Sequence, residues 1–239
     1  MRLRRTAMSA VAALGVAALL PLSASAARPG PVPFKPPTAP SATVAGTCTL
    51  SAPTRVAISK PYMTLPTKVT GTCATSPNSL SGWELTHPSK GPVLDLVFDN
   101  ATTDTWEVYS DDPIGIQSFS PLGSWDGADN PLTQNTLSTT VKLAAGAWIS
   151  SSRSADVVTL KGTSLLYSTS KNIFFKRSAS GVFQYRDKGT TTWKNLKAVT
   201  TNSAGEVTFA YRYAPARDYR FALYSTPISW DLASAVTTR

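Results

Sequence analysis

Histidine and cysteine are scarce in this chain of 239 residues, which contains one histidine and two cysteines. A metal site built from cysteine and histidine needs several such ligands, so we expect no metal and no cofactor. A serine–histidine–aspartate triad would depend on His87, and no serine lies in the Gly-x-Ser-x-Gly elbow that presents such nucleophiles in many hydrolases. We interpret His87 as a turn residue at the end of a strand, and we assign no catalytic residue.

Long apolar runs are equally few. The one extended run, residues 7–22, follows three arginines and precedes Ala24-Ser25-Ala26. Basic, apolar and small-residue segments in this order are typical of a secretory signal peptide. The run is too short to span a bilayer comfortably, since a spanning helix needs about 20 apolar residues. We therefore predict a signal peptide at residues 1–26 and a secreted, extracellular product with no membrane anchor after cleavage.

Charged residues make up only 15% of the chain. After removal of the predicted signal peptide, 20 basic residues stand against 14 acidic ones, a net charge of +6. The basic residues are scattered and form no nucleic-acid-binding motif, so nucleic acid is not an expected partner. A moderate positive charge favours anionic surfaces, such as cell-wall polymers or acidic polysaccharides.

The two cysteines are Cys48 and Cys73. Outside the cell they would meet oxidising conditions, in which pairing is the default. A metal pair or a reactive thiol is the rival interpretation. We predict a Cys48–Cys73 disulfide that links two adjacent strands.

Prolines crowd residues 27–42, which we interpret as an extended linker because proline fixes φ and lacks a backbone donor. From Thr43 onward helical periodicity is absent. Residues 206–213 and 217–224 alternate with a period of two, which indicates half-buried antiparallel strands. Many short strands separated by frequent turns favour sandwiches of about 100 residues. We predict an all-β protein with one sandwich domain at residues 43–149 and another at 150–239, the boundary being a polar serine-rich run.

The second half also resembles a known family. Residues 181–197, GVFQYRDKGTTTWKNLK, combine an apolar-Gln-Tyr-Arg strand, a glycine turn and a strand with tryptophan, and Arg217-Asp-Tyr-Arg220 and Ser229-Trp230 follow. This pattern, over residues 155–239, resembles immunoglobulin-like β-sandwich modules of secreted actinobacterial proteins; the first half resembles them only loosely. The resemblance implies two tandem immunoglobulin-like antiparallel sandwiches and export. It implies little about function, because such modules serve as spacers, adhesion units or carbohydrate-associated domains.

Two groups of side chains in the second half carry further predictions. Trp193, Tyr185 and Tyr219 are large, and we expect them to fill the core while their polar atoms find partners. Outward basic side chains are candidates to contact an anionic ligand, and we select Arg186, Lys188, Arg212 and Arg220. The rival interpretation is that scattered charge keeps the protein soluble and prevents pairing between strand edges.

Seven aspartates gather in the first half: Asp95, Asp99, Asp104, Asp111, Asp112, Asp126 and Asp129. A carboxylate pair could hydrolyse glycosides, and the same residues could bind calcium, but neither spacing is diagnostic. Aspartates that make turns by capping their own backbone explain the pattern more simply. The sequence therefore favours a non-enzymatic secreted binding or structural protein that associates with cell-wall or other anionic polysaccharide. The alternative is a secreted glycoside hydrolase that uses an acid pair in the first domain.

Overall fold

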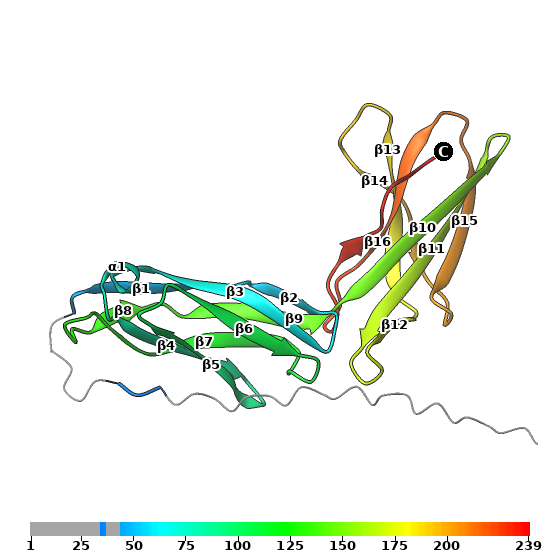
Figure 1. Cartoon of the computed structure of the whole chain (residues 1–239). Coiled ribbons are helices and arrows are strands. Elements are labelled where there is room, and N and C mark those ends of the chain that lie inside the picture. The colour runs from blue at the N-terminus through cyan, green and yellow to red at the C-terminus, as the bar shows by residue number, and fades with distance from the viewer. Residues whose placement is uncertain (1–33, 37–43) are drawn as a thin grey trace, which may run out of the picture.

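The computed structural model describes residues 34–36 and 44–239, and Figure 1 shows the arrangement of their strands. The predicted signal peptide at residues 1–26 lies outside the described residues, and so does most of the predicted proline-rich linker. Within the described part of the chain, no helix is long and apolar enough to cross a membrane.

The first nine strands form two sheets packed face to face (Figure 1). One sheet has the order β6-β3-β1-β8, with bounds Thr103–Tyr109, Tyr62–Gly71, Gly46–Ser51 and Leu132–Gln134. The other has the order β2-β9-β7-β4-β5, with bounds Arg55–Ile58, Leu137–Leu143, Gly115–Trp125, Leu80–His87 and Gly91–Asp99. Neighbouring strands are antiparallel except for the outer pairs β1·β8 and β2·β9, which are parallel.

Aromatic side chains dominate the core between these two sheets. Trp83 and Trp106 are fully buried and meet Phe98 and Phe119 edge to face, with ring centroids 5.9 and 5.3 Å apart. This T-shaped geometry places the positive ring edge against the negative ring face. The Trp83 indole also donates a hydrogen bond to the Asn135 carbonyl at 2.9 Å. A large, specific core therefore holds the first sandwich together.

The predicted disulfide between Cys48 and Cys73 is confirmed, with the two Cα atoms 5.3 Å apart. Cys48 lies on β1, as expected. Cys73 lies two residues beyond the end of β3, in the single-turn helix α1 (Thr72–Thr75), and not on a strand. The chain leaves the strand at Gly71, whose φ of 96° is accessible to glycine at little cost. The bridge thus ties the first strand to the turn that follows its neighbour.

The remaining strands form the second sandwich. In one sheet β10 (Ala145–Ser154) pairs with β11 (Val157–Ser168). Residues 157–163 of β11 also pair with β15 (Glu206–Arg212), and residues 165–168 pair with β12 (Ile173–Lys176). The other sheet has the order β14-β13-β16-β17, with β18 also on β16. Their bounds are Lys194–Thr200, Ser180–Asp187, Arg217–Leu223, Leu232–Ala233 and Thr237–Thr238. The all-β class with tandem sandwiches is confirmed.

The second core follows the predicted alternation of β16. Tyr219 and Phe221 are fully buried, and Leu223 is nearly so, as the period of two requires. The Tyr219 hydroxyl lies 2.7 Å from that of Tyr211 on the opposite sheet. Burial, together with this hydrogen bond, raises the pKa of Tyr219. The buried hydroxyl is therefore neutral and paired.

The two sandwiches are joined with almost no linker. Only Ala144 separates β9 from β10, and β10 runs through the serine-rich stretch and the 149/150 position at which the sequence places the boundary. Tyr167 of β11 packs into the first core, and its amide donates to the Ala144 carbonyl at 2.9 Å. Near the C-terminus, Trp230 donates to the Val56 carbonyl of the first sandwich at 2.7 Å. These contacts couple the two cores directly.

Candidate functional site

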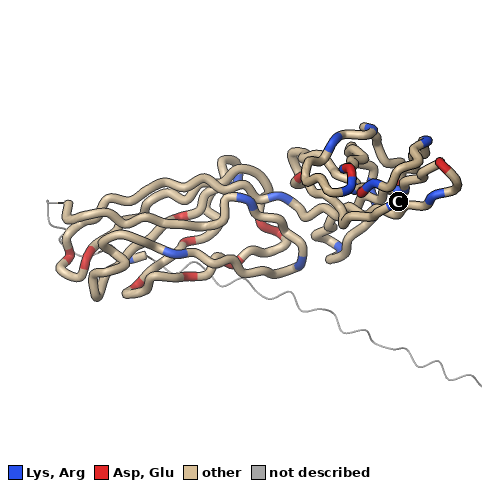
Figure 2. Tube along the Cα trace, turned by 90° about the horizontal axis from the view of Figure 1, so that it is seen from above, with Lys and Arg blue, Asp and Glu red and all other residues tan. Residues whose placement is uncertain are grey.

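Charge is divided unequally between the two sandwiches. Residues 44–144 contain five basic and nine acidic residues, whereas residues 145–239 contain 13 basic and five acidic ones, and Figure 2 shows where they lie. The second sandwich therefore carries a net charge of +8 and the first a net charge of −4. An anionic ligand would be drawn to the second sandwich.

The outer face of β13 and β16 gathers several of these basic residues. The strands pair with Gln184 opposite Arg220 and Arg186 opposite Asp218. Tyr219 and its inward neighbours alternate with these residues and fill the core, so the polar set lies on the outside of the sheet. The period of two that builds the core therefore also builds this polar surface.

The indole of Trp193 lies among these arginines. The guanidinium carbons of Arg186 and Arg220 are 4.9 and 4.3 Å from the ring centroid. Each such contact stabilises an exposed pair by about 0.5–1 kcal/mol. Gln184 holds Arg220 in place, because its Oε1 accepts a hydrogen bond from Arg220 Nε at 2.7 Å. Gln184 in turn donates to Asn195 Oδ1 at 2.8 Å, which fixes the amide.

A single carboxylate forms ion pairs with two of the three cations on this face. Asp218 lies 3.0 Å from Arg186 Nε and 3.5 Å from Lys188 Nζ. A hydrogen bond from Thr238, and then the one from Arg186, holds the pKa of Asp218 below its usual value. The aspartate is thus ionised at neutral pH. Three cations against one carboxylate leave the face with an excess of positive charge.

Arg220 is the cation without a carboxylate. Among the described residues, no acidic side chain lies within salt-bridge distance of it, and its partners are Gln184 and Trp193. Partial burial and the nearby charge of Arg186 lower the pKa of Arg220, although an arginine stays protonated. A ligand anion at this position would supply the missing partner. We call Gln184, Arg186, Lys188, Trp193 and Arg220 the Arg–Trp face.

Three of the four predicted ligand contacts come together here. Arg186, Lys188 and Arg220 share the Arg–Trp face, whereas Arg212 lies at the end of β15 in the opposite sheet. Arg212 points into solvent, with 80% of its side chain exposed, and pairs with Asp156 at 3.3 Å. Alternation along each strand identifies outward residues, but it does not say which sheet a strand joins.

The prediction that Trp193 fills the core is wrong. The side chain is half-buried, lies outside the second core cluster and packs on the two arginines instead. A register shift between Phe183 and Gln184 displaces the start of β14, next to Trp193, and a one-residue shift reverses the face on which a side chain lies. Tyr185 packs against the core at its edge, and Tyr219 lies fully within it.

Two aspartates of the first sandwich, Asp126 and Asp112, accept hydrogen bonds from main-chain amides in turns, whereas Asp104 lies within β6. Asp126 Oδ1 accepts from the amides of Ala128 and Asn130, both at 2.9 Å, and the Asn130 bonds lower its pKa. Asp112 accepts from the Tyr109 amide, and Asp104 from the next amide along the chain. Among the described residues, no three of His, Cys, Asp and Glu gather as metal ligands would.

The His87 ring contacts main-chain atoms of two segments. Its Nε2 lies 3.1 Å from the Ile114 carbonyl, and its Nδ1 lies 3.3 Å from the Ser89 amide. Nδ1 thus faces the turn that follows β4, which agrees with the interpretation of His87 as a turn residue, and Nε2 faces the segment that leads into β7.

No family model and no curated protein matches the sequence. Solved structures similar in fold include the native conformation of E. coli alpha-2-macroglobulin, at 9% identity and a TM-score of 0.41. That match covers 81% of this chain and 14% of the macroglobulin. Another is a tetra-tandem repeat from the extending region of a large adhesion protein, at 11% identity and a TM-score of 0.31, covering 81% of this chain and 49% of that one. The chain therefore spans less than half the length of either structure, and similarities at these TM-scores carry no inference about function.

Proposed function

We propose that this protein is a non-enzymatic extracellular binding protein whose Arg–Trp face binds an anionic polysaccharide. The observation that carries the proposal is the contact of Trp193 with two arginines, one of which has no carboxylate partner among the described residues. The disulfide supports an extracellular setting, because such bonds persist in oxidising compartments.

The chemistry of the face suits a charged sugar. An indole offers a flat apolar surface on which the C–H face of a sugar ring can pack, and its edge offers one hydrogen-bond donor. A guanidinium matches the geometry of a carboxylate or phosphate and binds it through two parallel hydrogen bonds. Trp193 with Arg186 and Arg220 places the apolar surface and the anion-binding groups side by side. An acidic polysaccharide of the cell wall or matrix carries the matching groups at regular intervals.

The sheet beneath the face supports binding by a preformed surface. Gln184 and Asp218 hold the two arginines by hydrogen bonds of 2.7 and 3.0 Å, so little side-chain freedom remains to be lost on binding. Gln184, Arg186 and Arg220 stand on paired strands, which keeps their spacing constant, whereas Lys188 and Trp193 lie in the connection between β13 and β14.

The test compares two arginines of the same chain. Arg220→Gln removes a charge from the Arg–Trp face, and Arg212→Gln removes one from the opposite sheet, where the arginine is exposed and already paired. We expect Arg220→Gln to weaken binding to polygalacturonate by about tenfold, because one charge-assisted contact is lost. Arg212→Gln should weaken the same binding less than twofold. Affinity electrophoresis with polygalacturonate in the gel, and with neutral dextran as the blank, measures both.

Salt adds a second criterion. Binding through exposed charges must weaken as ionic strength rises, because the screening length falls to about 10 Å at 0.1 M salt. Equal losses in both variants would mean diffuse attraction to the whole basic sandwich, and would overturn the proposed site. Absence of binding at low salt would overturn the proposed ligand class.

A further inference from the structure

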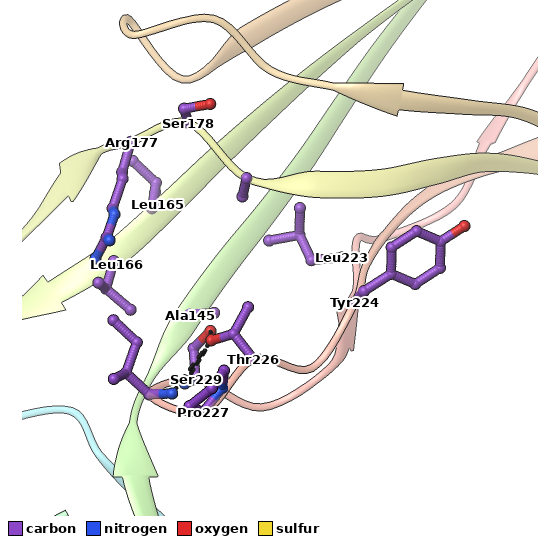
Figure 3. Close-up of a pocket in the computed structure, with 12 residues that line it drawn as sticks. Ala145, Leu165, Leu166, Arg177, Ser178, Leu223, Tyr224, Thr226, Pro227 and Ser229 are labelled. Atoms are coloured by element: carbon purple, nitrogen blue, oxygen red, sulfur yellow. Dashed lines mark hydrogen bonds between the residues drawn. The ribbon is translucent and has the colours of Figure 1, made fainter.

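A pocket of about 330 Å³ opens at the end of the second sandwich that adjoins the first (Figure 3). It lies between the two sheets, at the opposite end of β13 and β16 from Arg186 and Asp218. Its walls are mostly apolar, and are formed by Ala145, Leu165, Leu166, Ala179, Leu223 and Ile228. This pocket is separate from the Arg–Trp face, which lies on the outside of one sheet.

The pocket exists because small side chains stand where the two sheets end. Ala145 begins β10 and Ala179 precedes β13, and neither reaches far into the space between the sheets. Leu223 and Leu166 are 5% and 6% exposed, so the wall itself is well packed. The space is therefore bounded by ordered apolar side chains and is open at one side.

The floor of the pocket is held from the first sandwich. The segment 226–229 turns back on itself, with Thr226 Oγ1 accepting from the Ser229 amide at 3.0 Å. Lys142 donates to the Thr226 carbonyl at 2.6 Å, and the Leu143 amide donates to the Ile228 carbonyl at 2.8 Å. Both donors belong to β9 of the first sandwich. The cavity is thus preformed in the intact two-sandwich chain.

Arg177 supplies the charge at the rim. Its main chain is fixed, because its carbonyl accepts hydrogen bonds from Ser164 and Thr201. Its side chain is exposed and, among the described residues, has no ion-pair partner. No carboxylate lines the pocket. An apolar cavity with one unpaired guanidinium at its edge is complementary to a molecule with an apolar tail and a single anionic head.

The strand that leads into Arg177 extends the apolar surface beyond the pocket. β12 pairs with Leu165 and Leu166 of the pocket wall, yet its own Ile173, Phe174 and Phe175 are 52%, 41% and 38% exposed. Alternation along the strand places Ile173 and Phe175 on one face of β12 and Phe174 on the other, where its ring centroid lies 5.5 Å from that of Tyr167. Because Phe175 pairs with Leu166 of the pocket wall, a tail longer than the cavity would continue along the face that carries Ile173 and Phe175.

We propose that this pocket binds a single-chain anionic amphiphile, with the alkyl chain between the sheets and the head group on Arg177. The cavity is at the small end of the range for ligand pockets, about 300–1,000 Å³, so it suits one chain and not the two of a bilayer lipid. The ligand class follows from the walls and the rim charge alone, and is independent of the polysaccharide site.

The experiment titrates the full chain with dodecanoate below its micelle concentration, by isothermal titration calorimetry, with dodecanol and dodecyltrimethylammonium as matched probes. We expect one saturable dodecanoate site. Arg177→Gln should weaken dodecanoate about tenfold and leave dodecanol unchanged, because only the charged head contacts the guanidinium. Ala179→Leu should abolish binding of both by filling the cavity.

Controls make each result decisive. Lys171→Gln, an exposed cation on the same hairpin but outside the pocket, should bind dodecanoate like the wild type. Arg220→Gln should also bind dodecanoate like the wild type. If that variant no longer binds polysaccharide, the amphiphile proposal still stands, because the two sites are separate. Arg177→Gln changes an exposed side chain, so it remains informative if Ala179→Leu fails to fold. Equal affinity for the cationic probe, or no effect of Arg177→Gln, would overturn the proposal. Binding to phosphatidylglycerol vesicles without binding to dodecanoate would overturn it too, in favour of a membrane surface.

Discussion

We expect Trp230 to make the main stabilising contact between the two sandwiches, and Trp230→Ala tests this. The indole donates to the Val56 carbonyl at 2.7 Å, and the cations of Arg55 and Lys142 lie 4.1 and 4.4 Å from its ring centroid. The neighbouring Asp231 pairs with Arg55 at 2.8 Å, but both side chains are more than half exposed, so this ion pair adds little.

The magnitude follows from these contacts. One hydrogen bond contributes about 1 kcal/mol, and two exposed cation–π contacts about 0.5 kcal/mol each. Their loss weakens the junction by about 2 kcal/mol, which corresponds to about a 30-fold change in the equilibrium for its opening. Both sandwiches keep their own cores in the variant, because Trp230 belongs to neither core cluster.

Hydrogen exchange at single amides provides the assay. The Leu143 amide donates across the junction to Ile228, whereas the Ala144 amide donates to Ile58 within the first sandwich. In Trp230→Ala we expect the Leu143 amide to exchange about 30 times faster, and the Ala144 amide to change much less. Trp148→Ala is the matched control, because Trp148 is 63% exposed on β10. Equal exchange at Leu143 in the two variants would refute the role of Trp230.

Two further predictions concern stability. Replacing Cys48 and Cys73 together by serine should lower the free energy of unfolding by about 3 kcal/mol in the chain-entropy model, measured by urea denaturation without reductant; an unchanged midpoint would contradict it. Glu206 pairs with Lys161 and Lys176 at 2.8 and 2.5 Å, which lowers its pKa from 4.5 to about 2. Because the pKa of Glu206 is depressed in the folded state, the stabilisation from these ion pairs is full above pH 4.5 and is lost as the pH falls towards 2. Glu206→Gln should therefore lose less stability than the wild type over that pH range. Parallel curves of unfolding free energy against pH would disprove this.

Much of the architecture follows from local sequence pattern. The alternation at residues 206–213 and 217–224 predicts β15 and β16, including which residues of β16 are buried. The glycine of the turn predicted within residues 181–197, Gly189, takes a positive φ of 79°. These features depend on neighbours within a few residues, which a single sequence displays.

The features that the sequence does not predict depend on long-range context. Trp230 meets Val56 across 174 positions, and no local pattern marks that contact. The sequence places the domain boundary at the serine-rich run, yet that run lies within β10 because β11 pairs with its whole length. Part of the Arg–Trp face follows from the sequence, since alternation turns Arg220 outward. The register shift next to Trp193 depends on pairing between strands, which no local pattern predicts.

The central claim is that an acidic sugar binds at Trp193 and Arg220, and an NMR titration locates binding most directly. Isotope-labelled protein is titrated with an oligogalacturonate, and the indole N–H resonances of its six tryptophans are followed. We expect saturable shifts at the Trp193 indole and the Arg220 Nε–H, with the Trp148 and Trp230 indoles unchanged. Shifts spread evenly over the basic sandwich, or confined to residues away from Trp193, would contradict the account.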